Sequence, residues 1–389
     1  MIAGQGRLIF TCAALVLAFS AAPATAADAT PGDPTPLRIH TGGETGAYNQ
    51  SFCPPLAAAL SKAGYSYDCT ASRGSLDNME HVAAAQGDIA FAQLDVLTLE
   101  RGRFGNGKVF QTIRSGDFHE CIFAVARNPE LRSFGDIAAR ANQLRFILPP
   151  EDSGSASTFR YIQTLDSDLA GAANIRFVAD TDEAIRLALS ADDTVTLFVQ
   201  FADPDNPRFQ LINRLGGHFI PVIDRNILSA AIEGRSVYSA QETEVTDARW
   251  TEKGVKVVSA CTPLVVFTGA TDRLKDPVAA KTHDSIVRLI RELPAEAMRP
   301  ATGFLSKVLK RTREISAAAV DKLVDVSETA RDKAKPLIDK AKEATSKALE
   351  GAKPQVEKAA EGGAKTLEKA KETVKELIEP AGGSEKKTP

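Results

Sequence analysis

The feature that most constrains this chain is a short apolar strand that breaks into glycines just before a helix. Residues 37–40 read Leu-Arg-Ile-His and run directly into Thr-Gly-Gly-Glu-Thr-Gly-Ala-Tyr at 41–48. Glycine lets the main chain approach a ligand closely and aim its N–H groups at it. A helix expected over residues 51–63 would point its partly positive N-terminus at the same place. The pattern predicts a pocket for a small anion, with an ordinary strand-to-helix turn as the alternative.

Similar polar loops follow other expected strands. Residues 71–78, Ala-Ser-Arg-Gly-Ser-Leu-Asp-Asn, lie between a strand at 65–70 and a helix, and a third strand at 87–95 ends in Gln93 and Asp95. Strands alternate with helices along most of the chain, which predicts α/β layers with largely parallel sheets. Several strand ends therefore present hydrogen-bonding groups.

Three of these segments, taken together, resemble the TAXI family of periplasmic solute receptors, the binding components of tripartite TRAP transporters. The matching segments are residues 41–48, 74–78 and 88–95, and the resemblance covers roughly residues 37–298. It implies a two-lobed α/β fold of the type II periplasmic-binding-protein kind, which closes about two crossing strands. It also implies that solute is handed to the membrane permease subunits of a transporter.

The resemblance places an anion cradle at residues 149–158, before a helix expected at 159–169. Glu151 and Asp152 depart from the family pattern, because they would repel a carboxylate unless they point outward or meet an amino group of the ligand. An ordinary helix N-cap is the alternative for this loop. The candidate ligand-binding residues are Gly43, Thr45, Gly46, Tyr48, Ser75, Asn78, Gln93, Asp95, Ser153, Ser155 and Thr158.

The chain divides into an export signal, two lobes and a tail. Residues 1–26 combine an apolar run with Ala-Thr-Ala at 24–26, which predicts a signal peptide cleaved near Ala26 and a periplasmic location; an uncleaved anchor is the alternative. Residues 27–36 form a flexible leader. The expected domains are a first lobe of 37–120 plus 260–310, a second lobe of 121–259, and a tail of 316–389.

Four cysteines remain after the signal peptide, and an exported chain favours disulfides between them. Three connectivities are possible. Cys53 on the first helix and Cys69 at the end of the following strand are the favoured pair, which leaves Cys121 with Cys261. Buried free thiols are the alternative, and a zinc site with His119 is less favoured because no close pair of ligands supports it.

Other function classes find little support. A net charge of −3 argues against nucleic acid as a partner. The glycine loop lacks a P-loop lysine and a G-x-G-x-x-G pattern, and no G-x-S-x-G elbow accompanies the serines. We therefore expect no enzyme, no cofactor and no metal.

The expected function is an extracytoplasmic receptor that captures a small polar solute between its lobes. Strand-end and helix-start donors favour a dicarboxylate, a glutamate-like amino acid or a 2-oxo acid. The alternative is a periplasmic sensory or scaffolding protein that uses the same cleft while the tail contacts a partner.

The tail has a composition unlike the rest of the chain. Residues 316–389 hold 15 Lys or Arg and 14 Asp or Glu, with much alanine and no aromatic residue. An eleven-residue repeat puts three apolar rows on one helix face, including Leu323 with Ala334 and Val326 with Leu337. Pro336 and Pro354 are expected to divide this helix. The tail is expected to be a solvated helix or partly disordered, or else to contact a membrane surface, envelope material or another copy.

Overall fold

The computed structural model describes residues 37–105, 108–202, 206–246, 254–299 and 313–378. The expected signal peptide and leader, residues 1–36, lie outside the described residues, as does the end of the tail.

The first half of the fold, which we call lobe one, is built from three parallel strands and the helices that follow them. Its elements are β1 (Leu37–His40), a π-helical turn (Tyr48–Phe52), α1 (Cys53–Lys62), β2 (Tyr67–Thr70), α2 (Ser75–Ala84), β3 (Ile89–Gln93), α3 (Leu94–Glu100), α9 (Pro277–Glu292) and α10 (Ala295–Met298). β1 pairs in parallel with β2 and with β3. The strand ends of this lobe therefore meet at one edge, as the alternating sequence predicts.

The second half, which we call lobe two, repeats this design. Its elements are α4 (Phe134–Ala139), β5 (Arg145–Leu148), α5 (Gly154–Leu165), β6 (Asn174–Phe177), α6 (Thr181–Ala188), β7 (Thr194–Gln200), α7 (Pro207–Arg214), β8 (His218–Ile220), α8 (Arg225–Ser229), β9 (Ala231–Ile232), β10 (Arg235–Ser236) and β11 (Ser239–Glu244). β5 pairs in parallel with β6 and β7.

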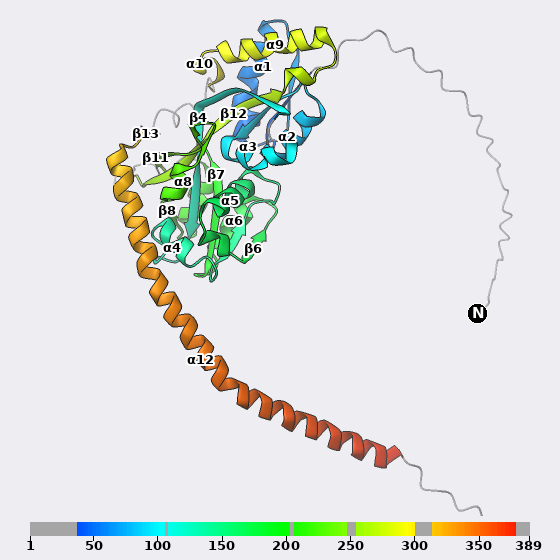
Figure 1. Cartoon of the computed structure of the whole chain (residues 1–389), viewed down its shortest axis with the longest axis vertical. Coiled ribbons are helices and arrows are strands. Elements are labelled where there is room, and N and C mark those ends of the chain that lie inside the picture. The colour runs from blue at the N-terminus through cyan, green and yellow to red at the C-terminus, as the bar shows by residue number, and fades with distance from the viewer. Residues whose placement is uncertain (1–36, 106–107, 203–205, 247–253, 300–312, 379–389) are drawn as a thin grey trace, which may run out of the picture. The chain divides into compact units, whose positions relative to one another are not determined.

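Two long strands join the lobes. β4 (Phe110–Ala126) and β12 (Lys256–Gly269) are neighbours in the sheet order β2-β1-β3-β12-β4-β7-β5-β6. The first part of β4 pairs with β12, and its last six residues pair with β7. In Figure 1 both strands run between the α1, α9 and α10 end of the fold and the α4, α5 and α6 end.

Each lobe has its own apolar core. Phe52, Leu56 and Phe91 belong to a cluster in lobe one, whereas Phe146 and Phe159 belong to one in lobe two. Separate cores and two crossing strands confirm the predicted two-lobed α/β fold.

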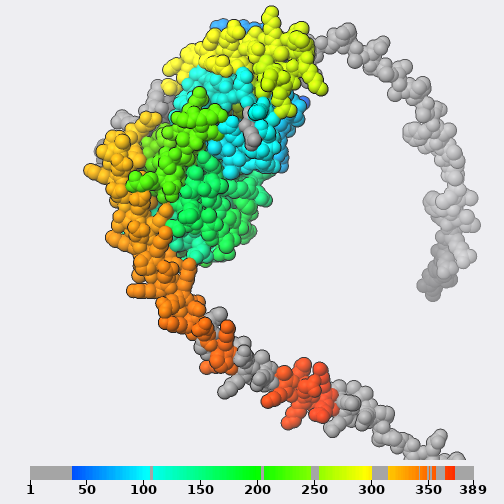
Figure 2. Space-filling view, in the orientation of Figure 1, coloured from blue at the N-terminus to red at the C-terminus, as the bar shows by residue number. Residues whose placement is uncertain are grey.

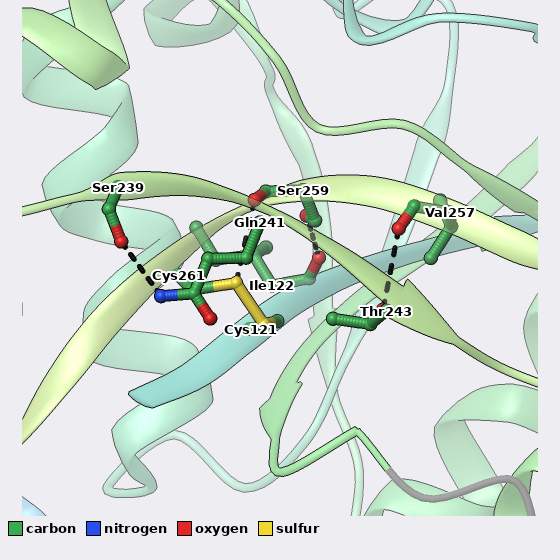
Figure 3. Close-up of a disulfide and its surroundings, with 8 residues drawn as sticks. All are labelled: Cys121, Ile122, Ser239, Gln241, Thr243, Val257, Ser259 and Cys261. Atoms are coloured by element: carbon green, nitrogen blue, oxygen red, sulfur yellow. Dashed lines mark hydrogen bonds between the residues drawn. A yellow bond between two sulfur atoms is a disulfide. The ribbon is translucent and has the colours of Figure 1, made fainter. Parts of the chain in front are cut away.

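Both expected cysteine pairs are disulfides in the structure. Cys53 is bonded to Cys69 across α1 and β2, and Cys121 is bonded to Cys261 across the two crossing strands. Figure 3 shows the second disulfide beside Ser259, whose hydroxyl donates to the carbonyl oxygen of Ile122. The segments that join the lobes are thus linked covalently as well as by the sheet.

The tail forms one helix, α12 (Ala317–Ile378), preceded by the short strand β13 (Arg313–Glu314) on the edge of β11. Its continuity corrects the expectation of breaks at Pro336 and Pro354, which both lie inside the helix. Ala334 and Ile338, on either side of Pro336, are buried, and their packing holds the backbone helical there. Nothing in the described contacts explains the continuation past Pro354.

Within the described residues, no helix is both long enough and apolar enough to cross a membrane.

Candidate functional site

A cavity of about 440 Å³ is lined by residues of both lobes. The lobe-one side comes from the glycine loop after β1, from the start of α2 and from the end of β3. The lobe-two side comes from the start of α5, the end of β7 and the start of α7. The lining residues are Gly42, Thr45, Gly46, Ala47, Tyr48, Gln50, Ser51, Gly74, Ser75, Gln93, Glu120, Gly154, Ser155, Val199, Gln200, Phe201, Asn206 and Arg208.

Many of the residues singled out from the sequence lie on this wall. They are Thr45, Gly46, Tyr48, Ser75, Gln93 and Ser155. They come from separate strand ends and helix starts, and a parallel sheet brings such ends to one edge. The structure thus assembles these groups around one space.

Two candidates in lobe one make hydrogen bonds within the lobe instead of lining the cavity. Asn78 is fully buried, and its side-chain amide donates to the carbonyl oxygens of Thr41 and Phe91. Gly43 is exposed, and its carbonyl oxygen accepts from the amide of Gly46 within the loop. Neither residue lines the cavity.

Asp95 and Thr158 bond to each other across the lobes and are not among the residues that line the cavity. The fully buried carboxylate of Asp95 accepts hydrogen bonds from the hydroxyls of Thr158, at 2.6 Å, and Tyr238, at 2.8 Å. Burial raises the pKa of Asp95, although the hydrogen bonds from Thr158 and Tyr238 act to lower it. Asp95 therefore joins the two lobes rather than lining the cavity.

The loop before α5 behaves largely as a helix cap. Ser153 accepts a hydrogen bond from the amide of Ala156, which makes it the N-cap of α5. The two acidic residues of this loop are not among the residues that line the cavity. Glu151 pairs with Arg160 at 2.8 Å, and Asp152 pairs with Arg73 of lobe one at 2.9 Å.

The cavity contains an acid that sequence reasoning missed. Glu120 is 7% exposed and accepts hydrogen bonds from the hydroxyl of Tyr48 and from the side chain of Gln93. Burial raises the pKa of Glu120 to about 7, and the nearby Asp95 adds to the shift. Burial also raises the pKa of Tyr48, and Glu120 adds to this shift. The only sequence signal was its place beside Cys121, on a strand that crosses between the lobes.

The cavity also contains a cation that was missed. Arg208 donates to Asp182 at 2.7 Å and to the side-chain oxygen of Gln200 at 3.1 Å. It lies in the first turn of α7, where Asn206 is the N-cap and Pro207 follows it. Asn followed by Pro is a helix-start signal that could have located this residue.

Among the described residues, two buried side-chain atoms of the cavity lining have no hydrogen-bond partner. They are the acceptor Oε1 of Gln93 and the donor Nε2 of Gln200. The Gln93 oxygen lies so close to the start of α5 that a Cβ atom on Gly154 would be 2.1 Å from it. Buried polar atoms normally have partners, so the wall offers one acceptor and one donor to a polar ligand.

No metal site accompanies this cavity in the described part of the chain, where no group of three or more His, Cys, Asp or Glu residues is arranged to hold an ion.

Comparisons with known proteins give similarity only at a low level. No protein-family model and no curated protein sequence matches the chain. Among solved structures, malate-bound MatC from Rhodopseudomonas palustris is 10% identical and has a TM-score of 0.41, with 78% of this chain and 98% of that chain covered. PhnD1 from Prochlorococcus marinus, in complex with methylphosphonate, is 12% identical and has a TM-score of 0.40, with 78% of this chain and 100% of that chain covered.

A third solved structure, the GluR0 ligand-binding core with L-glutamate, is 12% identical and has a TM-score of 0.38, with 72% of this chain and 100% of that chain covered. No family, ligand or function of this chain follows from similarity at this level.

Proposed function

We propose that this chain is an extracytoplasmic receptor that takes a small polar solute into the cavity between its lobes. The observation that carries the proposal is the pair of buried atoms without partners, Gln93 Oε1 in lobe one and Gln200 Nε2 in lobe two. A ligand that bonds to both would draw the lobes together, because the closed state gains contacts from each side.

The charges of the wall favour an anionic group on the solute. Arg208 brings a guanidinium to the cavity, and the starts of α2 and α5 add Ser75 and Ser155. Helix starts and arginine both favour carboxylates. The carboxylates of a dicarboxylate, a glutamate-like amino acid or a 2-oxo acid can accept from these donors and from Gln200 Nε2. Of the three, only the amino acid also carries a donor, its ammonium group, for Gln93 Oε1.

Glu120 offers a way to distinguish these solutes. Its pKa of about 7 means that it is partly protonated near neutral pH. A purely anionic solute beside it favours the protonated form, so affinity should fall as the pH rises above 7. An ammonium group facing Glu120 favours the ionised form, so affinity should rise over the same range.

The resemblance of residues 41–48, 74–78 and 88–95 to TAXI receptors supports a role in a TRAP-type transporter. In this proposal the first 26 residues direct export, and the receptor delivers its solute to membrane permease subunits.

The test is calorimetry of the full-length chain with L-glutamate, succinate and 2-oxoglutarate, with choline as a cationic control. At least one anion should bind. Arg208→Gln should weaken the binding of that anion by about 1.5–3 kcal/mol, because a hydrogen bond to a charged group is lost. Binding of choline alone, or an unchanged affinity in the variant, would contradict the anion proposal.

A second candidate is a periplasmic sensory or scaffolding protein, and the docking of the tail on lobe two favours it. Truncation after Ile338 leaves the docked turns in place, so it removes only the distal tail. A transport receptor should keep solute uptake after this change, whereas a sensory protein should lose its response.

A further inference from the structure

Helix α5 connects the cavity with the C-terminal tail. Gly154 and Ser155, at its N-terminus, line the cavity. Asp166, its C-terminal cap, accepts a hydrogen bond from Arg331 of α12. Twelve residues at 1.5 Å per residue give a length of about 18 Å between these two places.

Arg331 is held by two buried carboxylates of lobe two. Its Nη2 atom lies 2.5 Å from Asp166 and 2.9 Å from Asp224. The two aspartate side chains are 0% and 2% exposed, and that of Arg331 is 14% exposed. A third acid, Asp168, lies 3.7 Å from Arg331 and pairs with Lys335 at 2.9 Å.

Each buried aspartate uses its other oxygen within lobe two. Oδ1 of Asp166 accepts from the amides of Asp168 and Leu169, which follow α5. Oδ1 of Asp224 accepts from the amides that begin α8, a helix that packs on α5. The guanidinium of the tail therefore bonds to two carboxylates whose other oxygens fix the C-terminal end of α5 and the start of its neighbour.

The contact between the tail and lobe two has a defined register. The amide of Gly135 in α4 donates to the hydroxyl of Ser327 at 2.9 Å, and a Cβ on Gly135 would lie 2.0 Å from the Ser327 carbonyl oxygen. The buried or half-buried positions of this face are Val324, Ser327, Arg331, Ala334 and Ile338. Their alternating spacing of three and four residues is that of one packed helix face.

This face agrees only in part with the apolar stripe expected from the eleven-residue repeat, because Leu323 and Ala334 of one row are half-buried and buried. Val326 and Leu337, one row of that stripe, are 62% and 66% exposed. Figures 1 and 2 show the first turns of α12, in orange, against lobe two beside α4. The docked face thus includes one predicted apolar row together with Arg331 and excludes another.

We propose that docking of the proximal tail, residues 317–338, and solute binding in the cavity are coupled through α5, with Arg331 as the positioning residue. The tail has two states, docked and released. In the docked state Arg331 fixes the C-terminal end of α5, where a cation is also favoured by the helix dipole. Because a packed helix moves as a unit, the same contact fixes Gly154 and Ser155 in the cavity wall.

Coupling of this kind is reciprocal. If docking raises solute affinity by some factor, then solute must favour docking by the same factor. This solute-dependent statement rests on the proposed function, whereas the effect of Arg331 on the start of α5 does not.

The first experiment is amide hydrogen exchange on the full-length chain, without solute, for wild type, Arg331→Gln and Arg331→Lys. Glutamine should speed exchange about tenfold at residues 154–158 as well as in the proximal tail, and lysine should restore part of the protection. The matched control is Arg225→Gln, which removes the exposed pairs of Arg225 with Asp325 and Glu328 of the tail and should leave residues 154–158 unchanged.

Faster exchange in the tail with unchanged exchange at residues 154–158 would overturn the coupling. If the Arg331→Gln variant exchanges rapidly throughout the chain, the comparison of Arg331→Lys with wild type tests the coupling instead. A weakened contact of residue 331 with Asp166 and Asp224 should speed exchange in the tail and at residues 154–158 more than in the rest of the chain.

The second experiment uses L-glutamate as the probe. Arg331→Lys should weaken its binding about fivefold, and saturating L-glutamate should slow exchange in the wild-type tail by a similar factor. Weaker binding without this protection would overturn the coupling while leaving the receptor function intact. If L-glutamate does not bind the wild type, this choice of solute is wrong. The exchange experiment without solute then tests whether Arg331 and residues 154–158 are coupled.

Discussion

The cavity and the tail anchor each contain an arginine and at least one buried acid, but they differ in how far their buried groups are paired. At the anchor, Arg331 Nη2 bonds to Asp166 and Asp224, and both aspartates also accept backbone amides. The Nε atom of Arg331 is buried without a hydrogen bond, but it lies 3.7 Å from the carboxylate of Asp168. In the cavity, Gln93 Oε1 and Gln200 Nε2 are buried without partners.

This difference separates a structural joint from a binding site. A buried charged cluster is stable only when its atoms have partners, and the carboxylates of the anchor meet that condition. Buried groups without partners cost free energy in the empty protein, and a ligand that pairs with them recovers it. The predictions below change one side of this comparison at a time.

The largest expected effect is on the anchor. Arg331→Gln leaves Asp166 and Asp224 buried and repelling each other, so the free energy of unfolding should fall by about 3–5 kcal/mol in urea denaturation. Arg225→Gln, at an exposed pair on the same interface, should cause no measurable change. Adding Asp166→Asn and Asp224→Asn to Arg331→Gln should recover part of the loss, and failure to recover any would mean that the cluster does not act through its charges.

The next effect concerns the acid in the cavity. Since the folded pKa of Glu120 is raised from 4.5 to about 7, its contribution to stability is full below pH 4.5 and is lost as the pH rises through 7. Glu120→Gln should therefore remove up to about 3 kcal/mol of the decline in unfolding free energy across that window. Urea unfolding at pH 4.5, 6 and 8 measures it. The exposed Glu44→Gln should keep the wild-type profile, and an unchanged slope for Glu120→Gln would contradict the assignment.

A smaller effect is expected where the lobes meet. Thr158→Val removes one of the two hydroxyl donors of the buried Asp95, and Tyr238→Phe removes the other. Each change should lower the free energy of unfolding by about 1–3 kcal/mol. The exposed Thr329→Val in α12 serves as a control. If both single variants match wild type, Asp95 is not held by these hydroxyls.

The smallest effect is expected at the mouth of the cavity. Thr45 is exposed and lines the cavity, so Thr45→Ala should leave stability unchanged and weaken solute binding by about 1 kcal/mol. Calorimetry with the tightest-binding anion measures this change. A loss of stability with unchanged affinity would move Thr45 from the binding wall to the loop scaffold.

Local patterns in the sequence predicted the elements of the fold well. The strands expected at 37–40, 65–70 and 87–95 and the helix expected at 51–63 match the structure to within two residues, whereas α5 begins five residues earlier than expected. The favoured disulfide of Cys53 with Cys69 joins neighbouring elements, so short-range order was enough to find it. The helix start at Asn206 and Pro207 carried a similar local signal that was overlooked.

The candidate site was predicted only in part. Strand ends and helix starts identified Thr45, Ser75 and Ser155, because a parallel sheet gathers such positions at one edge. The same reasoning also selected Asn78 and Thr158, which the structure places in hydrogen bonds within the fold. A polar side chain at a strand end can face a cavity or a neighbouring backbone, and the sequence does not distinguish the two.

The sequence by itself determined what depends on a few neighbouring residues: the α/β order, most helix limits, the helical tail and the pairing of nearby cysteines. Only the tertiary structure decided which charges meet, because Arg331 and Asp166 are 165 positions apart. A charged residue in a repetitive helix looks solvated from its neighbours alone. Whether it is solvated or buried depends on the surface that packing brings against it, and here that surface holds two buried aspartates.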